Sequence, residues 1–162
     1  MIRLHRPNCP HPIALTNGNY KHELNKKALL ESTHHKCMYC ESKIMHSNFG
    51  DVEHIKPKAP EFFPELEFEW SNLGIVCDKC NIAKGKKYFA GAEFIDPYSE
   101  DPSQHFITSG SILFNRDGDE RGDLSIIEID LNRAQLIERR TEHLKRLHSA
   151  YVAARRATIP AL

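Results

Sequence analysis

Two stretches, Asp51-Val-Glu-His-Ile-Lys-Pro-Lys58 and Cys77-Asp-Lys-Cys-Asn-Ile-Ala-Lys-Gly-Lys-Lys87, decide the fold of this chain. The first predicts a short strand from Asp51 to Ile55, since the prolines that follow exclude regular structure. Leu73–Val76 predicts a second strand, and Cys80–Lys87 predicts the start of a helix. The centre of the chain is therefore expected to be a strand–strand–helix module.

Four of the five cysteines form two Cys-x-x-Cys pairs, Cys37 with Cys40 and Cys77 with Cys80. Four thiolates satisfy the closed tetrahedral coordination of a structural zinc, which leaves no open position for water. The pairs therefore predict one structural Zn²⁺ that performs no chemistry and ties the turn at 37–40 to the strand–helix junction. A redox pair, or two unrelated pairs, is the alternative. Three nearby histidines are expected to lie on the surface or behind the ligands: His34, His35 and His46.

Length and composition indicate one compact domain of ordinary soluble character. The chain has 162 residues, of which 40% are hydrophobic and 27% are charged. It contains no apolar run near the roughly 20 residues that span a bilayer. Its first residues lack the apolar core of a signal peptide, so we expect a cytoplasmic protein whose cysteines bind metal rather than form disulfides.

The net charge is zero, but the charges are unevenly distributed along the chain. Residues 1–90 carry 13 Lys and Arg against 10 Asp and Glu, residues 91–130 carry 2 against 10, and residues 131–162 carry 7 against 2. Two basic segments therefore flank an acidic one. This pattern suits contacts with nucleic acid at two faces, while the balanced total argues against strong non-specific binding.

Outside the central module, the N-terminal half predicts turns, one helix and a loop. Residues 1–19 are rich in proline, asparagine and glycine and predict extended or turn structure. Apolar residues at helical spacing predict a helix from Tyr20 to about His34, and Asn48-Phe-Gly50 predicts a turn. The stretch 61–70 alternates acidic and aromatic residues, and we favour a loop packed against the core over a binding groove.

The C-terminal half predicts three short strands at His105–Thr108, Ile112–Phe114 and Leu124–Ile129, separated by turn signals. Asp130 can then cap a long helix through about Ala157. The apolar positions of this helix follow spacings of 3, 4 and 7: Ile137, Leu144, Leu147, Tyr151 and Ala154. Its basic residues lie largely off that stripe and are either solvated or face nucleic acid or a partner. The fold class is therefore α+β.

The central module also carries the residue types that cleave a phosphodiester bond. Such a site needs a base for water, a divalent cation and oxygen ligands for that cation. His54 is the natural base, because an imidazole titrates near neutral pH. Glu53 offers a carboxylate and Asn81 a neutral amide oxygen, and hard oxygen ligands suit Mg²⁺.

The motifs Asp51-x-Glu53-His54-Ile-x-Pro, Trp70-x-Asn72-Leu and Cys77-x-x-Cys80-Asn81-x-x-Lys84-Gly resemble the HNH endonucleases. The resemblance covers about 50 residues, from Cys37 to Lys87. It implies a ββα-metal core braced by a Cys₄ zinc over about 34–90, with an N-terminal helix, an acidic β and turn region over about 91–130, and a basic C-terminal helix over about 131–157.

The same resemblance assigns roles to individual residues. It implies that His54 is the general base, that Glu53 and Asn81 hold the catalytic metal, and that Asn72 orients the histidine or braces the loop. Asn81 replaces the last histidine of the family pattern, which favours Mg²⁺ or Mn²⁺ over Zn²⁺ or Ni²⁺ at this position. Asp51 either supports the metal or caps a turn. A regular strand points adjacent side chains to opposite faces, so a bend near His54 is required.

Five lysines surround these motifs in sequence, and we expect some of them to contact the substrate backbone: Lys56, Lys58, Lys84, Lys86 and Lys87.

A narrower resemblance extends to Asp96-Pro-Tyr, to the turn at Gly118 and Gly122, and to Asp130-Leu-Asn-Arg133. These segments are similar to the PtuB-type HNH proteins of the Septu and retron anti-phage systems, which act with an ATPase partner called PtuA. The resemblance implies an effector nuclease within a defence complex, and in retrons a reverse transcriptase–DNA complex as a further partner. The alternative is a zinc-braced adaptor that binds nucleic acid or protein without cutting it.

Overall fold

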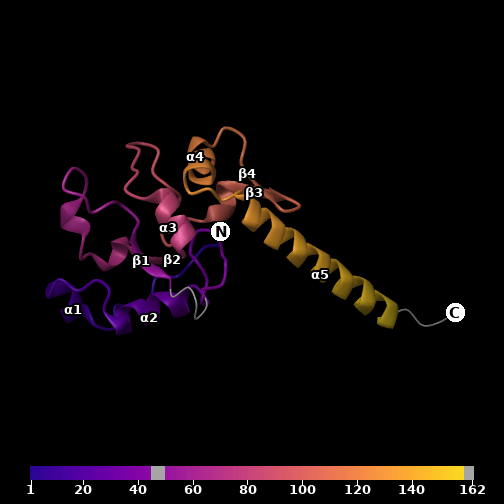
Figure 1. Cartoon of the computed structure of the whole chain (residues 1–162), viewed down its shortest axis with the longest axis horizontal. Coiled ribbons are helices and arrows are strands. Elements are labelled where there is room, and N and C mark those ends of the chain that lie inside the picture. The colour runs from indigo at the N-terminus through magenta and orange to yellow at the C-terminus, as the bar shows by residue number, and fades with distance from the viewer. Residues whose placement is uncertain (45–49, 159–162) are drawn as a thin grey trace.

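The computed structural model describes residues 1–44 and 50–158. Within these ranges the chain forms two small antiparallel sheets covered by short helices, and one long helix extends away from them (Figure 1). The helices and strands in chain order are α1 (Pro12–Thr16), α2 (Glu23–Ser32), β1 (Asp51–His54), β2 (Leu73–Val76), α3 (Asp78–Lys84), β3 (Phe106–Ser109), β4 (Ile112–Asn115), α4 (Glu120–Glu128) and α5 (Ala134–Thr158).

The predicted strand–strand–helix module is present. β1 and β2 pair antiparallel, with Asp51 opposite Val76 and His54 opposite Leu73. A bend at 55–56 follows β1 directly, where the sequence required one. The residue after β2 is Cys77, the N-cap of α3, and this helix packs against β1. The second Cys-x-x-Cys pair therefore lies at the junction of β2 and α3, as expected.

The turn at the first cysteine pair packs directly on β2. The Met38 amide donates a hydrogen bond to the Ile75 carbonyl at 3.0 Å. The Met38 side chain fills the space beside Gly74, where an added Cβ would overlap its sulfur. Both Met38 and the apolar residues of β2 are buried. This contact explains the glycine in an otherwise apolar strand, because a glycine allows close approach of another segment.

The N-terminal segment is better ordered than the sequence suggested. The expectation of only extended or turn structure over 1–19 was wrong, since α1 begins at Pro12 and the His11 ring accepts a hydrogen bond from the Ala14 amide. Proline suits this first helical position because its missing N–H has no partner there anyway. Arg6 donates to the carbonyls of Trp70 at 2.8 Å and Leu73 at 2.6 Å, which fastens this segment to the start of β2.

One predicted strand is a helix. Leu124–Ile129 lies mostly within α4, which Asp119 caps by accepting a hydrogen bond from the Gly122 amide at 2.7 Å. Gly122, Ser125, Ile126 and Ile129 are buried, which is the spacing of one helical face. The two other predicted strands are present as the β3–β4 hairpin, with Phe106 opposite Asn115.

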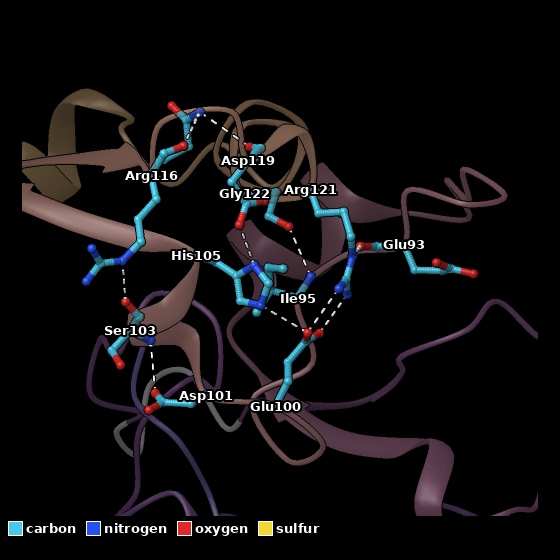
Figure 2. A network of polar contacts seen from close by, with 12 residues as sticks. Glu93, Ile95, Glu100, Asp101, Ser103, His105, Arg116, Asp119, Arg121 and Gly122 are labelled. Carbon is cyan, nitrogen blue, oxygen red and sulfur yellow. Dashed lines mark hydrogen bonds and ion pairs between the residues drawn. The ribbon is translucent and has the colours of Figure 1, made fainter.

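A polar network joins α4 to the segment before β3 (Figure 2). The two ring nitrogens of His105 lie 2.6 Å from an Asp119 carboxylate oxygen and 3.0 Å from a Glu100 oxygen. Arg121 donates to both oxygens of Glu100 at 2.7 and 3.0 Å. Burial is the largest single influence and raises the pKa of Glu100, but the hydrogen bonds from Arg121 and the Asp96 amide, with the charges of Arg121 and His105, together hold that pKa below the usual value. Glu100 and Asp119, two of the acidic residues of the segment 91–130, are thus paired with other side chains of the fold.

The long helix begins later than predicted, and Asp130 does not cap it. Asp130 has a positive φ of 54° and lies in the turn before the helix, where the Arg133 carbonyl accepts the first helical hydrogen bonds. α5 then runs for 25 residues and projects away from the rest of the fold (Figure 1). Leu144, Leu147 and Tyr151 of its apolar stripe are 42%, 53% and 60% exposed. Across the described residues, none of the helices combines the length and the apolar character needed to span a membrane.

Candidate active site and metal centre

The four cysteines of the two pairs converge, as predicted. The sulfurs of Cys37, Cys40, Cys77 and Cys80 all lie within 4.8 Å of one another, and all four residues are buried, free thiols. Cys40 and Cys77 sulfurs are 3.7 Å apart. Four sulfurs about 2.3 Å from a tetrahedral zinc would be roughly 3.8 Å apart, so the cluster fits a structural zinc. Among the described residues it is the one cluster of His, Cys, Asp and Glu with this geometry.

The histidines near the first pair do not join this cluster. His34 and His35 lie in a turn with positive φ values of 54° and 57°, and neither ring is grouped with the sulfurs. His46 and most of the turn predicted at Asn48–Gly50 fall outside the described residues.

Arg133, the residue just before α5, covers the sulfur cluster. Its guanidinium lies 3.5 Å from the Cys40 sulfur, 3.6 Å from Cys80 and 3.9 Å from Cys77. Burial works against its charge, but the neighbouring Cys80 and Cys40 outweigh that effect and raise the pKa of Arg133. A cation here offsets the negative charge that four thiolates place around a zinc. Sequence analysis did not assign this contact to Arg133.

Glu53 is held by a buried lysine of α3. The Lys84 ammonium lies 2.5 Å from Glu53 Oε1 and donates to the His54 carbonyl at 2.9 Å. The side chain of Lys84 is 0% exposed and that of Glu53 is 10% exposed. Burial raises the pKa of Glu53, and the Lys84 charge opposes that rise. The expected contact of Lys84 with a substrate backbone is therefore wrong for this conformation, because its ammonium is enclosed.

Asp51 and Asn81 form the neighbouring contact between β1 and α3. The Asn81 amide nitrogen lies 3.4 Å from an Asp51 carboxylate oxygen, and Lys21 pairs with the same carboxylate at 2.8 Å. Asp51 and Glu53 share one face of β1, because they are two residues apart. Asn81 and Lys84 share one face of α3, because they are three apart. The structure therefore brings Asp51 and Asn81 into contact and places Glu53 on the same face of β1, where its carboxylate is paired with Lys84.

His54 is buried and fixed through one ring nitrogen. Its Nε2 lies 2.9 Å from the Glu67 carbonyl, and the Tyr20 ring meets it edge-on with centroids 4.7 Å apart. A carbonyl oxygen only accepts hydrogen bonds, so Nε2 carries the hydrogen and Nδ1 is the nitrogen free to take a proton from water. Burial lowers the pKa of His54, which keeps the ring neutral near pH 7.

Asn72 braces the loop that follows β1. Its side-chain oxygen accepts from the Lys56 amide at 2.8 Å, and its side-chain nitrogen donates to the carbonyls of Lys56 at 2.9 Å and Leu66 at 3.2 Å. These bonds fix the start and the end of the loop that carries the His54 anchor, Glu67. Of the two roles that the family resemblance implied for Asn72, the contacts match the brace.

An open cavity of about 490 Å³ lies beside these residues. Glu53, His54, Lys58, Glu67 and Lys86 are among the residues that line it. The other lysines of the predicted ring are differently placed. Lys56 extends over the Phe63 ring at 5.2 Å, and Lys87 pairs with Glu128 of α4 at 2.7 Å. The structure therefore brings Lys58 and Lys86 to the cavity and places Lys87 against the acidic segment.

The chain matches a family model described as HNH endonuclease over residues 37–87. That range begins at the first cysteine of the cluster and ends just after α3, so it spans the whole module described above. Residues 37–87 form an HNH endonuclease domain. The HNH domain contains both cysteine pairs, β1, β2 and α3, whereas Tyr20, Lys21 and Arg133 contact it from outside that range.

Curated relatives extend the similarity beyond the HNH domain. The chain is 31% identical over 157 residues to "Septu protein PtuB" of Bacillus mycoides (strain KBAB4), which covers 78% of this chain and 52% of that protein. It is 36% identical over 118 residues to "Septu protein PtuB" of Bacillus thuringiensis, covering 65% and 45%. The chain thus spans about half the length of the curated relatives it matches. The similarity supports the narrower resemblance predicted from the outer motifs.

Proposed function

We propose that this chain is a metal-dependent endonuclease that hydrolyses phosphodiester bonds of nucleic acid, with His54 as the general base. The observation that carries the proposal is the single anchor of the His54 ring. The Glu67 carbonyl holds Nε2–H at 2.9 Å, which leaves Nδ1 to accept the proton of an attacking water. Burial keeps the ring unprotonated at neutral pH, as a base requires.

Glu53 and Asn81 would hold the catalytic Mg²⁺ or Mn²⁺, with Asp51 beside Asn81 as a supporting carboxylate. When bound, the cation would stabilise the charge that develops on the phosphate and on the leaving oxygen. Lys84 keeps Glu53 and the end of β1 in place from the buried side. Lys58 and Lys86, which line the cavity, would contact phosphates of the substrate. The Cys₄ zinc would fix the two ends of the module.

We further propose that the nuclease acts in a Septu-type defence assembly together with a PtuA-type ATPase. The similarity to two PtuB proteins supports this assignment. A retron complex with a reverse transcriptase is a second setting for the same kind of nuclease. The exposed basic helix α5 and the acidic segment before it are the surfaces we expect to meet protein partners, since neither is needed to form the cavity.

A substrate survey tests the proposal. The purified chain is incubated with plasmid, single-stranded DNA and tRNA in Mg²⁺ or Mn²⁺, alone and with a co-expressed ATPase. We expect metal-dependent cleavage of at least one substrate, and its loss when the metal is chelated. The rival function is a zinc-braced adaptor that binds without cutting. Binding of these substrates with no cleavage in any preparation, and zinc as the sole metal bound, would favour the adaptor.

A further inference from the structure

Tyr20 reaches the nuclease centre from outside the HNH domain. It lies in the segment between α1 and α2, well before residue 37, where the family match begins. Its ring meets the His54 imidazole edge-on, with centroids 4.7 Å apart and planes inclined by 69°. Among the described residues of the module, His54 is the only histidine, and the Tyr20 ring packs against its imidazole.

The same tyrosine also holds Lys58. The Lys58 ammonium donates to the Tyr20 hydroxyl at 3.2 Å and lies 4.3 Å from the centre of the Tyr20 ring. It also pairs with the Glu67 side chain at 2.6 Å. Burial is the largest single influence on Lys58 and opposes its charge, but the bonds to Glu67 and Tyr20 and their charges together outweigh it and raise the pKa, so the cation is retained. Lys58 lines the cavity beside His54.

Four residues therefore form a closed ring of contacts. Tyr20 touches His54, His54 bonds the Glu67 carbonyl, the Glu67 carboxylate pairs with Lys58, and Lys58 returns to Tyr20. Three of the four line the cavity, and Tyr20 supports them from the N-terminal segment. An imidazole fixed only at Nε2 can still tilt about that hydrogen bond. The Tyr20 edge restricts this motion, so that Nδ1 keeps one direction.

We propose that Tyr20 is a positioning residue of the nuclease centre, whose ring orients the imidazole of His54 and whose hydroxyl and ring face hold Lys58 for a substrate phosphate. This inference rests on the proposed nuclease function. The ring alone contacts His54, whereas the hydroxyl bonds Lys58. Substitutions that remove the hydroxyl or the whole ring therefore separate the two roles.

Tyr20→Phe retains the ring and removes only the hydroxyl bond to Lys58. We expect kcat to change less than about 2-fold and KM to rise about 3-fold, because one hydrogen bond to a binding cation is lost. Tyr20→Leu removes the ring edge and should lower kcat by about 10-fold or more, since small misplacements of a catalytic group have large effects on rate. Tyr151→Leu on α5 is the matched control, because Tyr151 is 60% exposed and lies outside the site.

A second measurement does not depend on cleavage. Long-range ¹H–¹⁵N spectra near neutral pH report which nitrogen of each imidazole carries the hydrogen, and a His54→Gln sample identifies the His54 signals. We expect a single Nε2–H tautomer in the wild type, in Tyr20→Phe and in Tyr151→Leu. Tyr20→Leu should give averaged shifts of a ring that exchanges between tautomers.

The outcomes distinguish a failure of the proposed nuclease function from a failure of the positioning role of Tyr20. If the wild type cleaves nothing, the proposed function fails, and the spectra still decide the role of Tyr20. If Tyr20→Leu retains both the wild-type kcat and a single Nε2–H tautomer, the positioning role is wrong whether or not the wild type is a nuclease. Thermal unfolding of each variant is recorded alongside. Rescue of kcat by phenylalanine, but not by leucine, supports orientation by the ring.

Discussion

Lys84 and Glu53 form an ion pair of 2.5 Å at the contact between α3 and β1, and the lysine side chain has no exposed surface. Breaking a buried pair by removing one partner typically costs about 3–5 kcal/mol, because the other charge remains buried alone. Lys84 also bonds the His54 carbonyl, so the pair fixes the place where β1 ends. The buried lysine thus ties the two elements of the site together.

Lys84→Met should lower the free energy of unfolding by a few kcal/mol, measured by urea denaturation of the zinc-loaded chain. Lys86→Met is the matched control, because Lys86 is 75% exposed and its pair with Glu61 is a solvent-screened surface contact that contributes little to stability. Equal stability of the two variants would show that Lys84 does not stabilise the buried carboxylate.

The pH dependence of cleavage should follow the lowered pKa of His54. Burial is the main cause, and the charges of Lys58 and Lys84 add to it, while the Glu67 contact opposes it. The base acts unprotonated, so a lower pKa extends activity to lower pH. We expect the acid limb of kcat/KM to have its midpoint below about 6.5, the ordinary value for histidine.

Lys58→Met tests one contribution to the lowered pKa of His54, the charge of Lys58. Removing a positive charge near the ring should move the midpoint upward, toward the ordinary histidine value. Profiles recorded in both Mg²⁺ and Mn²⁺ separate this effect from the ionisation of metal-bound water. A wild-type midpoint above 6.5 in both metals would contradict a buried His54 base.

The zinc prediction is tested with two cysteine variants. The wild type should contain one zinc per chain, and Cys77→Ser should lose the metal and unfold at lower temperature, because metal binding contributes directly to folding in such sites. Cys9→Ser is the control, since Cys9 lies outside the cluster and contacts Asn25. Elemental analysis and thermal melts provide the measurements. Full zinc content in Cys77→Ser would refute the four-sulfur site.

Arg133 should affect the metal affinity of the same site. Residues that contact metal ligands typically change metal affinity by about 10–100-fold when they are replaced. Arg133→Met should therefore lower zinc affinity by about 10-fold or more in competition with a chelator. The exposed Arg139 of α5 provides the control, Arg139→Met. Equal zinc affinities in the two variants would leave Arg133 without a role at the cluster.

The sequence predicted the central module well because its signals are local. Leu73–Val76 is an apolar run that matches β2, and the cysteine spacing alone indicated a four-sulfur cluster. The strand predicted at Leu124–Ile129 failed because its branched apolar residues also fit one face of a helix. Asp119, with acidic residues at Glu120 and Asp123, was the helix-start signal that could have corrected it.

The contacts that complete the site come from segments far apart in the sequence, and no local sequence pattern predicts them. A lysine is rarely fully buried, so Lys84 was grouped with the lysines expected to contact the substrate backbone. Its position three residues after Asn81 on a helix that packs against β1 is what turns it toward Glu53. Tyr20 and Arg133 lie 34 and 53 residues from His54 and Cys80, the groups they contact, and only the fold brings them together.

The most direct test of the nuclease assignment is the single-turnover cleavage rate of His54→Ala, compared with the wild type on the best substrate in saturating Mn²⁺. We expect cleavage to fall by about 100-fold or more, the contribution of a general base, while zinc content and the melting temperature stay close to wild type. Wild-type cleavage by purified, folded His54→Ala would contradict the assignment of His54 as the base.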